Sequence, residues 1–210
     1  MKVENVLFDL DGTVIDSYSG IQGAFDFAYS KIYGKENHVS IKSIIGPPIG
    51  QILAKLNNEK DTARIENFVD LFKKQYDTND YKQSTLYDGI KEVLERLSKA
   101  NVKLYIATNK RFSATSLILD YLSVSGYFAG VYCNDSRNPI YSCKEEMVAE
   151  IIRNEVLEID STILVGDTFQ DQEAAKHNKV KFIYASYGFG NLQNVEWQVN
   201  KPIEVLNFIK

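Results

Sequence analysis

The sequence is poor in the residues that build several common kinds of site. Its 210 residues include 2 cysteines and 2 histidines. Cys133 and Cys143 do not have the CxxC spacing of a metal site, and His38 and His177 are too few and too scattered for a metal cluster. We therefore expect no metal site built from cysteine or histidine. Reduced thiols are expected, and a single disulfide is the alternative.

Long hydrophobic runs and an excess of basic residues are also missing. No apolar run approaches the roughly 20 residues that span a bilayer, and the segment MKVENVLFDL lacks the features of a signal peptide. Lysine and arginine total 24 against 28 acidic residues, whereas nucleic-acid-binding proteins usually have a basic excess. We expect a cytoplasmic protein that binds neither membranes nor nucleic acid. A few local cations could still bind a small anionic substrate.

The composition that remains is that of a globular protein, with 44% hydrophobic and 25% charged residues. Short apolar runs alternate with helical patterns, which predicts an α/β fold with a parallel sheet. The runs expected to form strands are 3–10, 102–107, 130–133, 163–165 and 180–185. The helical patterns between them cover about 89–100, 113–122, 143–156 and 170–177.

Residues 16–83 break this alternation, because their apolar residues recur at helical spacing and no strand pattern is found. The stretches GPPIG (46–50) and LNNEKD (56–61) are breaks between helices. We therefore predict an all-helical cap domain inserted into a discontinuous core of residues 1–15 and 84–210. Such a cap could close over the carboxyl ends of the strands, where open α/β sheets bind ligands.

The first strand ends in two acids, in the sequence VLFDLDGT. A buried carboxylate is costly unless something pairs with it. Asp9 and Asp11 could simply form a turn, since Asp-Gly is a common turn dipeptide. The alternative is that a cation lies at this strand end.

A later strand ends in the same way, in the sequence TILVGDTFQD. Asp167 follows the apolar run, and Gly166 would let the backbone come close to a ligand. Asp171 falls in the first turn of the next helix. It could cap that helix together with Thr168 or support a site.

Polar residues that could bind an anion follow the two remaining strands. Thr108, Asn109 and Lys110 end one of them, and the Thr108 hydroxyl could cap a helix or donate a hydrogen bond to phosphate. In YSCKEEM, Ser142 and Glu145 have the spacing of a capping box. Lys144 then lies in the first helical turn, where a cation is unfavourable unless an anion lies nearby.

These strand ends together predict a metal site. Several converging carboxylates repel one another unless a cation neutralises them. Oxygen ligands of this kind suit Mg²⁺, which often shares its coordination shell with a substrate phosphate.

The motifs are similar to those of the haloacid dehalogenase-like (HAD) superfamily. DLDGT (9–13), Thr108 in ATN, Lys144 and GDTFQD (166–171) occur in that family's order and spacing. The helical insertion and the segments IGPPIG and YGFG resemble its phosphoglycolate phosphatase-like branch. The resemblance implies a Rossmann-like parallel sheet core with an inserted all-helical cap. It also implies a Mg²⁺-dependent phosphatase that acts on a small phosphorylated metabolite.

The resemblance further implies a role for each motif residue. Asp9 attacks phosphorus and forms an aspartyl-phosphate. Asp11 protonates the leaving alcohol and then deprotonates the attacking water. The metal is bound by the Asp9 carboxylate, the Asp11 backbone carbonyl and Asp167. The phosphate is held by Thr108, Asn109 and Lys144, and Asp171 and Gly166 support the site.

Some alternatives stay open. The branch usually has proline after the motif lysine, where this chain has Glu145, so Lys110 is a rival phosphate-binding residue. A phosphomutase or another phosphotransferase would use the same aspartyl-phosphate, and a non-catalytic phosphate binder could keep the fold. A phosphoacceptor like a response regulator is disfavoured by the Asp-x-Asp pair and the helical insertion. The substrate and the oligomeric state cannot be read from the sequence.

Overall fold

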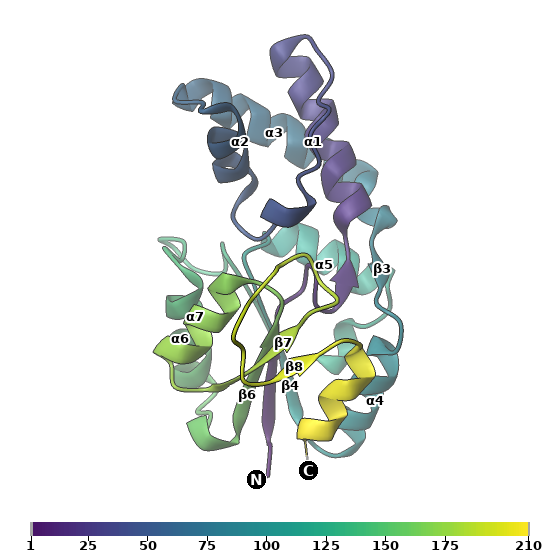
Figure 1. Ribbon diagram of the computed structural model, residues 1–210, viewed down its shortest axis with the longest axis vertical. Coiled ribbons are helices and arrows are strands. Elements are labelled where there is room, and N and C mark those ends of the chain that lie inside the picture. Colours follow the sequence, from purple (N-terminus) through teal and green to yellow (C-terminus); the bar gives the residue numbers. More distant parts are fainter. Residues whose placement is uncertain (1, 210) are drawn as a thin grey trace.

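The computed structural model describes residues 2–209, with a six-stranded sheet and its flanking helices at one end and a group of helices at the other (Figure 1). The strands are β1 Asn5–Phe8, β2 Ile15–Asp16, β3 Thr85–Leu86, β4 Lys103–Thr108, β5 Gly130–Cys133, β6 Thr162–Gly166, β7 Lys181–Ala185 and β8 Gln198–Val199. The α-helices are α1 Tyr18–Tyr33, α2 Ile49–Asn57, α3 Thr62–Thr78, α4 Ile90–Lys99, α5 Phe112–Tyr121, α6 Lys144–Asn154 and α7 Phe169–His177. Short 3₁₀ helices are η1 Lys42–Ile44, η2 Asp80–Gln83, η3 Ser125–Tyr127, η4 Ile159–Ser161 and η5 Pro202–Phe208.

The large sheet is parallel, with the strand order β5-β4-β1-β6-β7-β8. Phe8, at the end of β1, lies opposite Ile106 on β4 and Val165 on β6. The chain moves outward from β1 to β4 and β5 and then returns to β6 on the other side of β1. Open α/β sheets bind ligands at such a reversal, outside the carboxyl ends of the strands. This confirms the α/β fold class and explains why the polar strand ends meet.

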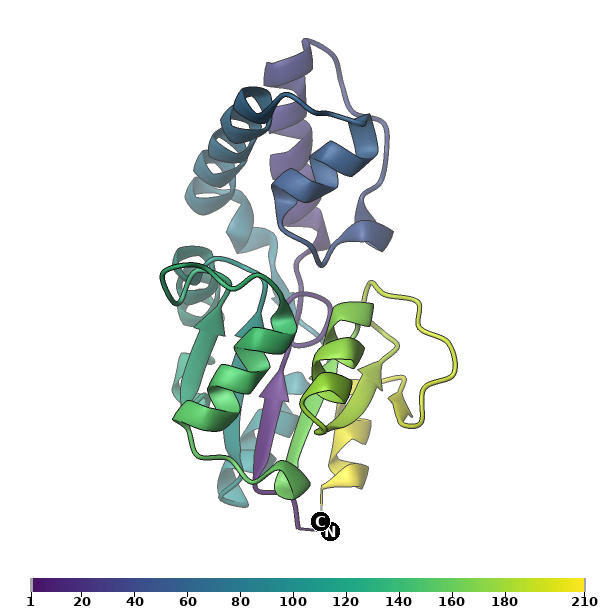
Figure 2. The ribbon, with the colours of Figure 1, turned by 90° about the vertical axis from the view of Figure 1, so that its left-hand side faces the viewer.

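Helices cover both faces of the sheet (Figure 2). Val6 and Phe8 of β1 belong to one hydrophobic cluster, which includes residues of α4 and α5. Leu7 points to the opposite face and joins a second cluster with residues of α6 and α7. A strand buried on both faces needs an apolar run, and β1 has one from Val6 to Phe8, with all four of its residues buried.

Helices α1 to α3, here called the cap helices, lie beyond the carboxyl ends of the strands (Figure 2). Their apolar faces pack together, with the rings of Phe25 and Phe68 5.0 Å apart between centroids. Helix α1 ends at Gly34, which has the left-handed conformation that glycine adopts at little cost. Helix α3 begins after Asp61, whose side chain accepts a hydrogen bond from the Arg64 N–H. The domain boundaries at residues 15 and 84 remain a prediction.

The sequence pattern missed the short strands β2, β3 and β8. Strands β2 and β3 pair antiparallel where the chain enters and leaves the cap helices, with Ile15 opposite Leu86 and Asp16 opposite Thr85. The expectation that residues 16–83 contain no strand is wrong only at Asp16, the last residue of β2, because β3 lies just beyond that range. Two residues are too few for hydrophobic alternation to be visible in a sequence, so only the tertiary pairing reveals such strands.

Two smaller expectations concern the cysteines and the membrane. Cys133 is buried, Cys143 is exposed, and both are free thiols. Within residues 2–209, no helix combines the length and the apolar character needed to cross a bilayer.

The packing of α1 gives a test of the fold. A Cβ on Gly20 would lie 2.2 Å from the Asp80 carbonyl oxygen of η2, whereas a Cβ on Gly23 would come no closer than 3.5 Å to the Asp80 side chain. We expect Gly20→Ala to lower the free energy of unfolding by about 1–3 kcal/mol, because backbone must move. Gly23→Ala on the same helix is the matched control. It should leave the value unchanged or raise it by up to about 1 kcal/mol, since alanine favours helix. Urea denaturation curves would measure both, and equal effects would contradict the packing described here.

Candidate functional site

Asp9 is the centre of the predicted site. It follows β1 directly, between the ends of β4 and β6, and its N–H donates to the Val165 carbonyl. The Lys144 ammonium lies 2.5 Å from Asp9 Oδ1 and 2.5 Å from Asp171 Oδ1. The side chains of all three residues are almost completely buried. An ion pair this far from water makes strong electrostatic interactions, and each unpaired charge there would be costly.

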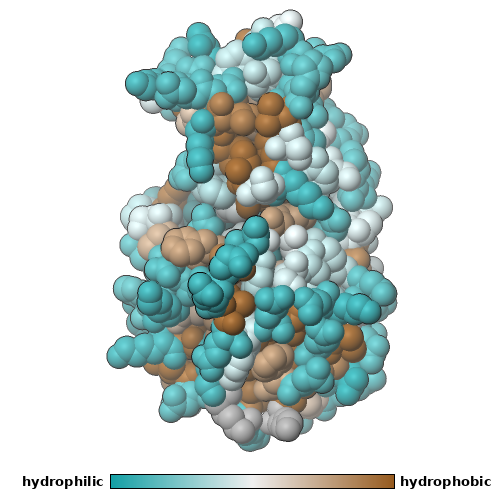
Figure 3. Space-filling model, in the orientation of Figure 1, coloured by the Kyte–Doolittle hydropathy of each residue, from teal (hydrophilic) through white to brown (hydrophobic). Residues whose placement is uncertain are grey.

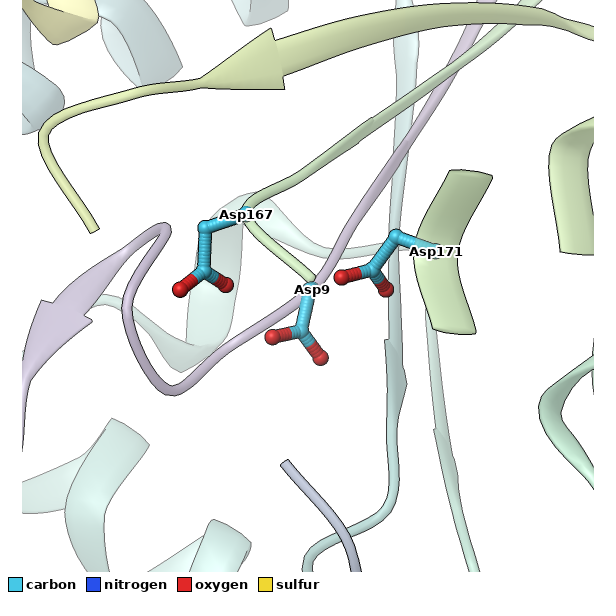
Figure 4. Close-up of side chains that lie close together, drawn as sticks. All are labelled: Asp9, Asp167 and Asp171. Carbon is cyan, nitrogen blue, oxygen red and sulfur yellow. The ribbon is translucent and has the colours of Figure 1, made fainter. Parts of the chain in front are cut away.

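Three buried carboxylates converge at this point. One oxygen each of Asp9, Asp167 and Asp171 lies within 4.8 Å of the others. Figure 4 shows the three carboxylates side by side, with that of Asp9 between the other two. Lys144 contributes one positive charge, so it cannot balance three ionised carboxylates.

This imbalance changes the proton affinity of the acids. Burial raises the pKa of Asp9 well above its usual value, and although Lys144 opposes this, the charges of Asp171 and Asp167 add to the increase. Burial and the charge of Asp171 raise the pKa of Asp167 to about 7, in spite of hydrogen bonds from backbone N–H groups. Burial alone would lower the pKa of Lys144, but Asp171 and Asp9 raise it above the usual lysine value, so it stays charged.

The donor set fits a divalent metal ion. The converging atoms are carboxylate oxygens, which are preferred by hard cations, and their charge exceeds that of the neighbouring lysine. A cation at this place would relieve the same repulsion that raises the pKa values of Asp9 and Asp167.

Glycines make room for these carboxylates. A Cβ on Gly166 would lie 2.3 Å from Asp171 Cγ, and a Cβ on Gly12 would lie 2.2 Å from Asp167 Oδ2. At Gly166, where a close approach was expected, Asp171 occupies the space that a Cβ would take. On Gly188, a Cβ would lie 2.3 Å from the Gly12 carbonyl oxygen.

The YGFG segment holds Asp167 in place. The N–H groups of Phe189 and Gly190 donate to Asp167 Oδ2 at 2.7 and 3.3 Å, and the Thr13 hydroxyl donates to Oδ1 at 3.3 Å. The motif was visible in the sequence, but its contact with Asp167 was not. Orienting the carboxylate in this way leaves it little freedom to turn from the cluster.

Asp11 faces a different set of partners. Its carboxylate accepts hydrogen bonds from Ser17 at 2.5 Å and from the Lys110 ammonium at 3.1 Å. Lys110 also lies 4.5 Å from the centre of the Tyr76 ring on α3. Sequence reasoning missed Ser17 and Tyr76, because nothing in their local pattern indicates contact with the Asp11 region.

The segment after β4 joins the predicted phosphate-binding residues to the cap. Thr108 is buried, and its hydroxyl accepts from the Lys110 N–H. The Asn109 side chain donates to the Gly46 carbonyl in the GPPIG loop at 3.1 Å. Arg111 makes a two-pronged contact with Asp77 of α3, at 2.8 and 3.2 Å.

A cavity of about 560 Å³ separates the cap helices from the strand ends. Its walls include the predicted catalytic and phosphate-binding residues, namely Asp9, Asp11, Thr108, Asn109 and Lys144, together with Lys110. The structure thus brings these residues around one space. Asp167, Asp171 and Gly166 do not line this cavity, although the carboxylates of Asp167 and Asp171 lie next to that of Asp9.

Two expectations about helix ends can be compared with the structure. The proposed capping box of Ser142 and Glu145 is wrong, because the Ser142 hydroxyl and N–H both donate to Glu146, one residue further on. Lys144 is nevertheless the first residue of α6, as predicted. Asp171 does form the cap with Thr168, whose N–H and hydroxyl donate to it, and it also contacts Lys144.

The acidic cluster predicts how stability depends on pH. Asp167 has a pKa of about 7 in the fold against an ordinary value of 3.8, so between these values the folded state binds more protons than the unfolded state. Stability should therefore fall as pH rises toward about 7, by at most about 1.4 kcal/mol per pH unit for this group. We expect the free energy of unfolding of metal-free protein to fall more steeply between about pH 5 and about pH 7 in wild type than in Asp167→Asn. Denaturation curves in EDTA would measure the slopes, and parallel curves would contradict the assignment.

The chain is similar to known proteins over most of its length. A family model described as haloacid dehalogenase-like hydrolase matches residues 6–185. A phosphoglycolate phosphatase of Aquifex aeolicus is 29% identical over 210 residues, covering 97% of this chain and 95% of that protein. A 5'-nucleotidase of Pseudomonas aeruginosa is 28% identical over 192 residues, covering 91% of this chain and 86% of that protein. Among solved structures, a haloacid dehalogenase-like family hydrolase of Streptococcus pneumoniae superposes with a TM-score of 0.88 at 25% identity, over 98% of each chain. As the motifs at the strand ends predicted, the chain belongs to the haloacid dehalogenase-like hydrolase family.

Proposed function

We propose that this hydrolase is a Mg²⁺-dependent phosphatase that cleaves a small phosphomonoester through an aspartyl-phosphate. The observation that carries the proposal is the buried Asp9 carboxylate, held 2.5 Å from Lys144 and facing a cavity large enough for a substrate. The relatives named phosphoglycolate phosphatase and 5'-nucleotidase support a phosphoric monoester as the substrate.

Asp9 acts as the nucleophile in the first step. One of its carboxylate oxygens forms a bond to phosphorus while the bond from phosphorus to the leaving oxygen breaks. Asp11 donates a proton to that oxygen, which departs as an alcohol. Covalent catalysis of this kind divides one difficult displacement into two easier ones.

In the second step a water molecule attacks the phosphorus of the aspartyl-phosphate. Asp11 now accepts the proton from this water, the bond between phosphorus and Asp9 breaks, and inorganic phosphate leaves. Asp11 thus serves as acid and then as base, and it ends in its starting protonation state. Its location on the cavity wall, two residues beyond Asp9, supports this role.

The phosphoryl group is held by Thr108, Lys144 and the backbone N–H of Asn109. The Asn109 side chain donates to the Gly46 carbonyl of the GPPIG loop. The backbone N–H of Asn109 is therefore the group proposed to bind the phosphate. Phosphoryl transfer depends mainly on positioning and charge stabilisation. Lys144 supports both, because it is fixed between Asp9 and Asp171.

Asp9, the backbone carbonyl of Asp11 and Asp167 would hold Mg²⁺, with Asp171 and Gly166 supporting the arrangement. When bound, the ion supplies positive charge that stabilises the charge on the transferring phosphoryl group. Asp171 supports the site by fixing Lys144 and Thr168.

Asp9→Asn tests the nucleophile. We expect Mg²⁺-dependent phosphate release from small phosphomonoesters in wild type and background release in Asp9→Asn, because the amide is a poor nucleophile. Asp11→Asn should lower kcat by roughly 10²–10⁴-fold, the range for loss of a general acid and base. Asp120→Asn, the same change at an exposed acid of α5, is the matched control and should keep full activity. Release that persists in Asp9→Asn, or that survives EDTA, would overturn the proposed mechanism.

A second comparison decides between the two lysines. Lys144 contacts Asp9, whereas Lys110 contacts Asp11. We therefore expect Lys144→Met to weaken competitive inhibition by inorganic phosphate by at least about tenfold, since a charged partner is worth more than about 1.4 kcal/mol. Lys110→Met should weaken it less. The opposite order would assign the phosphate to Lys110.

A further inference from the structure

The cavity between core and cap has two unlike ends. Its core end carries the charged groups of the proposed phosphatase site, Asp9, Asp11, Lys110 and Lys144. Its cap end is lined mostly by apolar side chains. In the space-filling view, hydrophobic residues gather in a hollow of the upper part of the molecule, where α2 and α3 lie, and hydrophilic residues frame them (Figure 3).

Helix α3 supplies one apolar wall. Ile65, Val69, Phe72 and Tyr76 recur at helical spacing and all line the cavity. The rings of Phe72 and Tyr76 are stacked with centroids 5.5 Å apart, and Tyr76 lies beside Lys110. These four residues form an apolar stripe on α3. It begins with Tyr76 at the core end of the cavity and continues along the helix, away from the charged groups.

The GPPIG loop and helix α2 supply the facing wall. Ile45, Pro47 and Ile49 line the cavity there. Gly50 brings this wall close to α3, since a Cβ on it would lie 3.1 Å from Val69 Cγ2. Ile140 lies in the α/β part of the chain, with 58% of its surface exposed, and adds an apolar side chain to the opposite side of the cavity.

Charge is scarce on the cap side of this space. Among the cavity-lining residues that the structure describes between 18 and 78, Lys73 alone is charged, and its ammonium lies 3.8 Å from Asp70. On the core side, Arg111 is paired with Asp77 and Lys110 with Asp11. An anionic leaving group, such as the glycolate carboxylate, would lose water here and gain no dedicated cation.

We infer that the substrate of this site carries an uncharged, mainly apolar leaving group, which packs between α3 and the GPPIG loop while the phosphate lies at Asp9. Burying apolar surface would favour such an ester, and the volume of about 560 Å³ is within the usual range for small-molecule sites. The inference rests on the proposed phosphatase function and deepens it, because it selects among phosphomonoesters.

A homologous series of n-alkyl phosphates, from ethyl to hexyl, tests the inference in the wild-type enzyme with Mg²⁺. The leaving alcohols have similar reactivity, so differences in kcat/KM report contacts with the alkyl chain. We expect kcat/KM to rise by up to about fourfold for each added methylene. Hexyl phosphate should exceed phosphoglycolate by at least about tenfold.

Substitutions on α3 locate the contact. Val69→Thr keeps the side-chain shape and should reduce the increase per methylene. Val69→Lys should also raise kcat/KM for phosphoglycolate relative to hexyl phosphate, because it places a cation on the apolar wall. Asn67→Lys adds the same residue to an exposed position of the helix and should leave the series unchanged.

The outcomes separate the two proposals. Asp9-dependent release with a flat alkyl series, or with phosphoglycolate as the better substrate, would overturn the apolar leaving group and leave the phosphatase intact. An increase with chain length that Val69→Thr does not reduce would also overturn the assigned wall. No release from any ester by folded, Mg²⁺-loaded protein would overturn the phosphatase function, and the inference would fall with it.

Discussion

The structure depends on the close approach of three buried carboxylates, two of which contact one lysine. Asp9, Asp167 and Asp171 lie within 4.8 Å of one another through single oxygens, and Lys144 touches two of them. Such a cluster is costly in a protein interior unless charge and hydrogen bonds compensate. The compensation comes from distant parts of the chain, including the backbone N–H groups after β7 and the first residue of α6. The need to compensate this charge links β1, β6, α6, α7 and the YGFG segment into one site.

A second link joins this site to the cap helices. Consecutive residues after β4 each reach across the cavity: Asn109 contacts Gly46, Lys110 lies beside Tyr76, and Arg111 pairs with Asp77. The same segment follows Thr108, the proposed phosphate ligand. A shift of the cap would therefore change contacts next to the proposed phosphate site. Contacts between the cap and the rest of the substrate could affect the phosphate site in this way.

Core and cap contribute differently to function. The core carries the groups proposed to react at phosphorus, and the model of the haloacid dehalogenase-like hydrolases matches residues 6–185. The cap contributes the apolar stripe of α3 and the GPPIG loop. Polar groups must contact the phosphoryl group at defined positions. An apolar wall binds a leaving group through non-directional contacts, which require only a complementary shape and apolar surface. In the proposed mechanism, substrate preference can therefore change through the cap while the chemistry at Asp9 stays the same.

The sequence by itself determined the fold class, the five main strands and the chemical types at their ends. Buried parallel strands need continuous apolar runs, and acids that follow such runs stand out. It did not reveal β2, β3 and β8, which are too short to show a period. The sequence pattern also predicted the wrong partner for Ser142. Glu145 has the spacing of a capping box, but the Ser142 hydroxyl donates to the adjacent Glu146. Only the tertiary structure decided that Asp11 faces Ser17 and Lys110. The same is true of the space that Gly166 leaves for Asp171. It also decided that the apolar residues of α3 face the cavity. These contacts join residues far apart in the chain or packed from separate elements, and local sequence patterns carry no information about such distances.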